Sequence, residues 1–123
     1  MKTSSILAAI MAASALTLAP VQYALAHAHP KHQSPDAGAS LARAPAEVSI
    51  EFDNALEPAF STLQVTDAQG RDVTTGKSTV DSVDKKLMKV SLKSLPAGNY
   101  AVAWVAVASD GHRTQGHYSF DVR

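Results

Sequence analysis

Apolar and polar side chains alternate with a period of two in several short segments of this chain. The alternation runs through residues 48–52, 63–65, 88–92 and 118–122. A period of two is typical of β-strands that bury one face and expose the other. Residues 100–108 are apolar at every position, and this run predicts a central strand that is buried on both faces.

Turn-forming residues separate these segments. Residues 67–70 contain Asp and Gly, and residues 96–99 contain Pro, Gly and Asn. Residues 27–46 show no sustained periodicity and predict an N-terminal arm or a short edge strand. Because no segment after residue 26 has a long apolar period of 3.6 residues, we expect no helix there. Several short strands at regular spacing predict an antiparallel β-sandwich or β-barrel.

The first 26 residues have a different pattern, that of a secretory signal peptide. Lys2 supplies a positive start, residues 6–18 form an apolar core, and small residues precede a cleavage point after Ala26. The core is too short for a membrane span, which needs about 20 residues. We therefore expect residues 1–26 to be removed during export. A second pattern of small residues leaves cleavage after Ala28 open.

Residues 27–123 are long enough for one small domain. The whole chain has 11 basic and 11 acidic residues, and this balance gives no reason to expect nucleic acid or an acidic membrane as a partner. It contains no cysteine, which excludes disulfides and thiolate metal ligands. The exported domain must therefore be held together by packing alone.

The histidines carry most of the candidate chemistry. All five lie after residue 26, and they are His27, His29, His32, His112 and His117. A chain that begins at His27 can chelate a metal through its α-amino nitrogen and the imidazole Nδ1 of the same residue. Gly111 separates Asp110 from His112 and allows a bend that presents a carboxylate and an imidazole together. Nitrogen and oxygen donors without sulfur suit Cu(II) and disfavour Cu(I), so the arm and this turn would form a Cu(II) site if they pack side by side.

Short motifs follow one another in a specific order along the exported part of the chain. They are an initial His, Ser-Pro-x-x-Gly at 34–38, Ala-Pro-Ala at 44–46, Pro-Ala-Phe-Ser at 58–61, Leu-Pro-Ala-Gly-Asn-Tyr at 95–100, Ser-Asp-Gly-His at 109–112 and Gly-x-Tyr-x-Phe at 116–120. In this order and spacing they resemble the CopC family of small periplasmic copper-binding proteins, over nearly all of residues 27–123. The resemblance implies a small all-β Greek-key barrel or sandwich of about seven strands, cupredoxin-like or immunoglobulin-like in shape.

The resemblance also implies a metal site. Family members bind Cu(II) through the N-terminal amine, the first histidine, and the aspartate and histidine of an Asp-x-His turn. The matching residues are His27, Asp110 and His112, so we expect one Cu(II) ion per chain. In the family the first histidine stands eight positions before the proline of the Ser-Pro-x-x-Gly segment, and His27 and Pro35 have this spacing. The spacing favours cleavage after Ala26.

The role that the resemblance implies is binding rather than catalysis. We expect a monomeric periplasmic protein, not an enzyme, that sequesters or delivers copper in copper homeostasis or resistance. An inner-membrane copper transporter or other copper-resistance proteins are the partners that the family suggests.

Two positions depart from the family pattern. Some members hold Cu(I) at a second, methionine-rich site, but the only methionine after residue 26 is Met88, which we assign to the core. Without clustered thioethers there is no soft site. Asn54 stands where some members place a glutamate near the copper, and an amide is a poor anionic ligand.

Three alternatives remain open. A free amine followed by a histidine at position three, here His29, can wrap Cu(II) or Ni(II) in a square plane through two deprotonated backbone amides, without any folded domain. An N-terminal histidine also holds copper in oxidative polysaccharide-cleaving monooxygenases, which is the enzymatic alternative. A β-sandwich that serves adhesion or assembly without a metal is the third. We expect His32 and His117 to be exposed polar residues.

Overall fold

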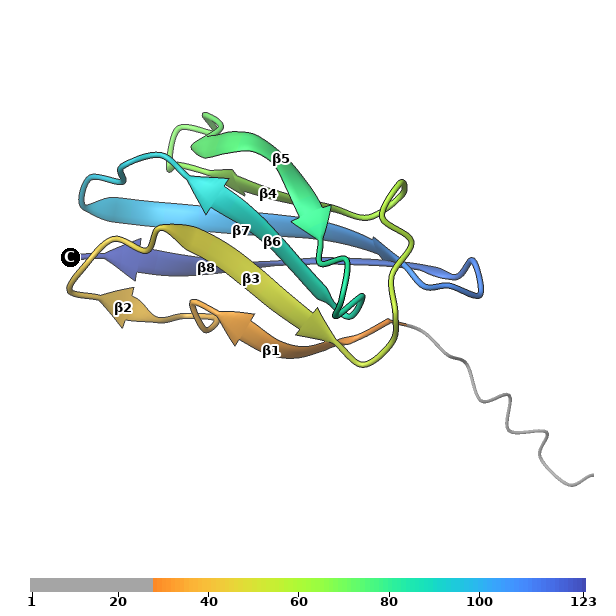
Figure 1. Cartoon of the computed structure of the whole chain (residues 1–123). Helices are drawn as coiled ribbons and strands as arrows, with labels where there is room; N and C mark the ends of the chain where they lie inside the picture. The colour runs from red at the N-terminus through yellow and green to blue at the C-terminus, as the bar shows by residue number, and fades with distance from the viewer. Residues whose placement is uncertain (1–27) are drawn as a thin grey trace, which may run out of the picture.

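The structure, a computed structural model, describes residues 28–123 as a two-layered β-sandwich (Figure 1). The predicted signal peptide at residues 1–26 and the predicted ligand His27 lie outside the described residues. Residues 28–123 contain no helix, and so none that could span a membrane. The all-β prediction is confirmed, and the two sheets form an open sandwich rather than a closed barrel.

Eight strands make up the two sheets. In chain order they are β1 (Pro30–Ser34), β2 (Ser40–Leu41), β3 (Glu47–Phe52), β4 (Thr62–Thr66), β5 (Thr74–Val80), β6 (Leu87–Leu92), β7 (Gly98–Val107) and β8 (Arg113–Val122). One sheet has the order β1-β3-β6-β5 and the other has the order β2-β8-β7-β4. All neighbouring strands are antiparallel except β2 and β8, which run parallel.

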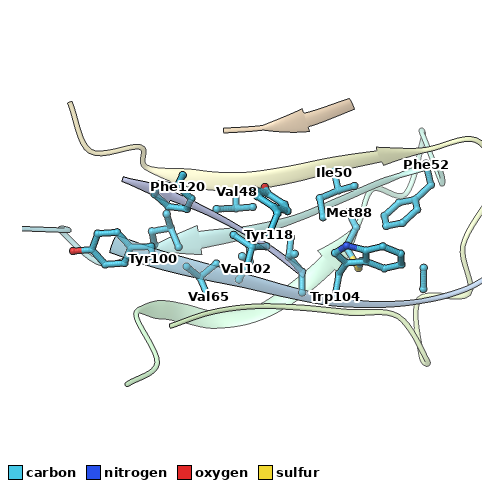
Figure 2. Close-up of a cluster of buried hydrophobic side chains, with 14 of the residues drawn as sticks. Val48, Ile50, Phe52, Val65, Met88, Tyr100, Val102, Trp104, Tyr118 and Phe120 are labelled. Carbon is cyan, nitrogen blue, oxygen red and sulfur yellow. The ribbon is translucent and has the colours of Figure 1, made fainter. Parts of the chain in front are cut away.

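The alternating segments of the sequence form the strands that they predict. Val48, Ile50 and Phe52 of β3 point into the space between the sheets and are fully buried (Figure 2). In β6 the same alternation buries Met88, whose assignment to the core is thereby confirmed. The pattern gave no indication of β5, because that strand is mostly polar and its register with β6 shifts around Gly76, where φ is 74°.

The central strand β7 differs from the prediction. Residues on one of its faces, among them Val102 and Trp104, are buried, but Ala101 and Ala103 on the other face are exposed. The prediction of burial on both faces was therefore wrong. Alanine is apolar but too small to require burial, so a run of Ala and Val does not by itself identify a strand covered on both sides.

Aromatic rings from both sheets meet in the core. The rings of Phe52 and Trp104 lie 5.3 Å apart, centroid to centroid, in an edge-to-face arrangement of 72°. Those of Tyr100 and Phe120 are stacked at 5.5 Å. Both geometries add a modest favourable term to the burial of the rings. Phe52 and Trp104 come from different sheets, whereas Tyr100 and Phe120 are neighbours within one sheet. In the absence of cysteine, the contact of Phe52 with Trp104 and the buried aliphatic residues hold the two sheets together.

Gly116 leaves room for the indole of Trp104. The two residues are partners in the pairing of β7 with β8. A Cβ atom on Gly116 would lie 2.6 Å from Cζ2 of Trp104 and 2.8 Å from Cε2, well inside van der Waals contact. The indole therefore occupies the volume that any side chain at position 116 would need.

The hydroxyl of Tyr118 is buried, and within residues 28–123 no hydrogen-bond partner reaches it. Burial, and to a lesser degree the negative charge of Asp36, raises the pKa of Tyr118 to about 12 from an ordinary value of 10.0. The folded protein thus binds this proton more tightly than the unfolded chain does. The contribution to stability is complete below pH 10 and is lost as the pH rises toward 12.

We expect Tyr118→Phe to leave stability unchanged or slightly higher at pH 8, since the variant removes a buried polar group that lacks a partner. At pH 11 the free energy of unfolding of the variant should exceed that of the wild type by about 1 kcal/mol more than at pH 8. At this pH the tyrosine ionises mainly in the unfolded wild-type chain, and the ionisation favours unfolding. Urea unfolding at the two pH values measures this difference. A constant difference between variant and wild type would contradict the assignment.

Candidate metal centre

The turn between β7 and β8 projects from one end of the sandwich (Figure 1). The amide of Ala108 donates to the carbonyl of His112 at 2.9 Å, and the amide of Gly111 donates to the carbonyl of Ala108 at 2.8 Å. Gly111 adopts a φ of 89°, a conformation that glycine reaches without steric cost. The turn therefore has the bend that the Asp-Gly-His sequence predicts.

The two predicted ligands of this turn contact each other. Asp110 Oδ1 accepts the backbone amide of His112 at 3.0 Å, and Asp110 Oδ2 lies 3.0 Å from His112 Nδ1. The side chains are 39 % and 51 % exposed, respectively, so an ion from solution can reach both. When Nδ1 donates to the carboxylate, the neutral imidazole keeps its lone pair on Nε2, which is then the nitrogen able to bind a metal.

The first described residue lies beside this turn. The hydroxyl of Thr114, two residues after His112, donates to the carbonyl of Ala28 at 2.6 Å. Ala28 itself is fully buried. The contact joins the N-terminal arm to the start of β8 across 86 positions of sequence, so the arm and the Asp-Gly-His turn lie side by side, as the Cu(II) hypothesis requires.

The next residue of the arm is held by the loop between β3 and β4. The amide of His29 donates to Asp53 Oδ1 at 2.8 Å, and the amide of Asp53 donates to the carbonyl of His29 at 3.0 Å. Asn54 Nδ2 donates to the same carboxylate oxygen at 3.4 Å. Asp53 therefore binds the arm through both its backbone and its side chain.

The same loop supports the base of the turn. The amide of Ser109 donates to the carbonyl of Ala55 at 3.1 Å, and the amide of Glu57 donates to the carbonyl of Val107 at 2.8 Å. Leu56 forms an isolated β-bridge with Ala108. Arm, loop and turn are thus joined by backbone hydrogen bonds at one end of the sandwich.

The structure brings together Asp110 and His112 but does not describe the third predicted ligand, His27. Among residues 28–123 no group of three or more His, Asp or Glu side chains could hold a metal. His32 and His117 are exposed, as expected, and belong to β1 and β8. They lie within regular strands, outside the turn that carries Asp110 and His112.

Two residues that organise this end of the sandwich were not identified from the sequence. The role of Thr114 could not be predicted because its partner is a backbone carbonyl far away in the chain. The partner of Asp53 is likewise a backbone group far away in the chain, the amide of His29. The inward-facing register of β8, which places Thr114 on the same side as Tyr118 and Phe120, is the signal that could have pointed to Thr114.

Known proteins resemble this chain over most of its length. The family model described as the CopC domain matches residues 30–123. Protein YobA of Escherichia coli strain K12 is 37% identical over 99 residues, which cover 80% of this chain and 80% of YobA. Copper transport protein CutJ of Bacillus subtilis strain 168 is 36% identical over 98 residues, which cover 79% of this chain and 18% of CutJ. The crystal structure of PcoC, described as a methionine-rich copper resistance protein from Escherichia coli, matches with a TM-score of 0.69 and 31% identity, and covers 80% of this chain and 100% of that chain.

Proposed function

This chain belongs to the CopC family, and from that membership we propose that it binds one Cu(II) ion and sequesters or delivers it in copper homeostasis or resistance. The proposal places the protein in the periplasm, after removal of residues 1–26. Copper is then the cargo of the protein, and the protein is a carrier rather than an enzyme. The names of CutJ, a copper transport protein, and of PcoC, a copper resistance protein, support this class of function.

The observation that carries the proposal is the junction of the arm with the Asp-Gly-His turn. Ala28 is hydrogen-bonded to Thr114, and Thr114 follows His112 by two residues. A mature chain that begins at His27 would offer its amine and imidazole one peptide unit before Ala28. Together with Asp110 and His112, these groups supply nitrogen and oxygen donors of the kind that Cu(II) prefers.

The donor set fits Cu(II) better than Cu(I). The carboxylate of Asp110 would offset part of the charge of a dication, and Nδ1 of His112 lies next to that carboxylate. No soft ligand competes within the described residues, because their only methionine, Met88, is fully buried. PcoC is described as methionine-rich, whereas this chain has only three methionines.

A copper-transport protein is the partner that we propose. CutJ carries a segment similar to this chain within a longer protein, of which the segment is 18%. In CutJ a domain similar to this chain is part of a copper transport protein. We infer that a separate domain of the same kind acts together with such a transport protein. The partner proposed here is an inner-membrane copper transporter.

The test is a Cu(II) titration of protein that begins at His27, followed by electron paramagnetic resonance. We expect one tightly bound equivalent per chain with a tetragonal spectrum dominated by nitrogen and oxygen ligands. Absence of tight binding, or two tight equivalents per chain, would contradict the proposal.

A further inference from the structure

The outer face of the sheet β2-β8-β7-β4 is open to solvent in the part of the chain that the structure describes. Its outward side chains stand at alternate positions of β4, β7 and β8 and are exposed or half-buried. At the centre of this face the register places Ala103 between Gln64 of β4 and His117 of β8. Because alanine is small, the middle of the face is a shallow groove of about 600 Å³.

The charges of this face lie at the two ends of β8. Arg113 stands four positions before His117 and Asp121 stands four positions after it, and all three side chains point outward and are exposed. Asp121 also accepts Nδ2 of Asn99 at 2.6 Å, which holds its carboxylate on this face. β4 and β7 contain no charged residue. The face is therefore positive at one end and negative at the other, with His117 midway between.

We propose that this outer face binds the same face of a second copy of the chain, with the strands of the two copies antiparallel. A twofold axis along the row of Gln64, Ala103 and His117 places each of these residues against its own copy. The same axis places Arg113 of each copy over Asp121 of the other, so that unlike charges meet at both ends. An axis along the strands would instead place β8 over β4, which carries no charge.

The central row is chemically complementary to itself. A glutamine amide and a neutral imidazole each contain both a donor and an acceptor, so Gln64 and His117 can each hydrogen-bond to the same residue of the other copy. Packed sheets lie about 10 Å apart and cross at about 30°. Residues four positions from the axis are then displaced sideways by about 7 Å, a distance that an arginine side chain spans. The proposed ion pairs are therefore within reach at the usual crossing angle.

The area of the face predicts a weak dimer. β7 and β8 have ten residues each, which corresponds to a length of about 33 Å, and three adjacent strands are about 15 Å wide. The two copies together would bury about 1,000 Å², which is near the lower limit for a specific interface. We therefore expect a dissociation constant of about 10–100 μM. This dimer differs from the monomer expected from the sequence, because strands that are distant in the chain assemble the face.

The edges of this sheet are less suited to binding a second copy. At the edge strand β4 the amide of Leu63 donates to Ser78 Oγ at 2.9 Å, and the carbonyl of Val65 accepts the amide of Val73 at 3.0 Å. At the opposite edge β2 has only two residues. Edges that are covered or very short disfavour pairing with another chain. The outer face is the larger surface that this sheet offers.

The experiment is sedimentation velocity of metal-free protein that begins at His27, from about 1 μM to about 1 mM. Arg113→Asp and Asp121→Arg each bring like charges together and should raise the dissociation constant at least about tenfold. The combined variant restores unlike pairs with reversed signs and should return to within about threefold of the wild type. Lys77→Asp makes the same change of charge at an exposed position of the other sheet and should have no effect.

Cross-linking locates the contact. The chain has no cysteine, so Ala103→Cys carries a single thiol, which in the proposed dimer lies against its own copy. A bismaleimide with a reach of about 10 Å should link Ala103→Cys and should not link Lys77→Cys. A protein that stays monomeric over the whole concentration range would overturn the proposal. A dimer with the same affinity in the wild type and in both single charge variants, all folded by circular dichroism, would also overturn it, because the contact would then lie on another face.

Discussion

Replacing His112 by alanine should weaken Cu(II) binding to the mature protein by at least about 100-fold. The substitution removes one of the two imidazole ligands of the proposed site. It also removes the group that orients the carboxylate of Asp110, since Nδ1 of His112 lies 3.0 Å from Oδ2. Competition titration against a chelator of known affinity measures the loss. Electron paramagnetic resonance should show fewer nitrogen ligands in any residual complex.

His117→Ala is the matched control for this experiment. His117 is also an exposed histidine, on the same strand that His112 precedes, and it pairs with Ala103 rather than with the arm. We expect its loss to leave Cu(II) affinity unchanged. Both side chains are exposed, so neither substitution should lower the free energy of unfolding by more than about 0.5 kcal/mol. Equal affinities of His112→Ala and wild type would contradict the proposed site.

A single glycine added before His27 should have an effect of similar size, again at least about 100-fold. The added residue converts the α-amine of His27 into an amide, which is not basic and no longer completes a chelate with the imidazole. The arm itself should keep its position, because Ala28 and His29 retain their hydrogen bonds to Thr114 and Asp53. The measurement is the same competition titration, with mass spectrometry to establish the first residue of each protein.

The two variants together distinguish the modes of binding. The extension removes the amine from either mode and moves His29 out of the third position, so it weakens both. His112→Ala weakens only the folded site. Loss of binding in both variants supports the folded Cu(II) site, whereas loss only in the extended protein would identify the chelate at His29. Unchanged binding in the extended protein would contradict any role for the N-terminal amine.

The strands that the sequence predicted are those whose burial is one-sided. Residues 48–52 and 88–92 alternate because each buries one face against the opposite sheet. β5 escaped prediction because it is a largely polar edge strand with a shifted register. The burial of β7 was overestimated because Ala101 and Ala103 are apolar without being buried. The composition of a segment shows which side chains can be buried, but the packing of the two sheets determines which of them are buried.

In the candidate site, the local interactions could be predicted from the sequence and the distant ones could not. Asp110 and His112 could be predicted as a pair because they are two residues apart and Gly111 allows the bend between them. The contacts of the arm could not, since Thr114 and Ala28 are 86 positions apart and Asp53 and His29 are 24 apart. These contacts exist only once the sheets have assembled. The alternation along β8 indicates that Thr114 faces inward, but not that it meets Ala28.

The packing of Trp104 against Gly116 has a consequence for how such a chain can change over generations. Because the indole fills the space above position 116, a side chain can appear there only if residue 104 becomes smaller, and a smaller residue 104 leaves a cavity unless residue 116 grows. Each single step passes through a less stable protein, and the two steps compensate each other. The two positions are therefore coupled, and we expect the sizes of residues 104 and 116 to vary inversely among descendants of this sequence.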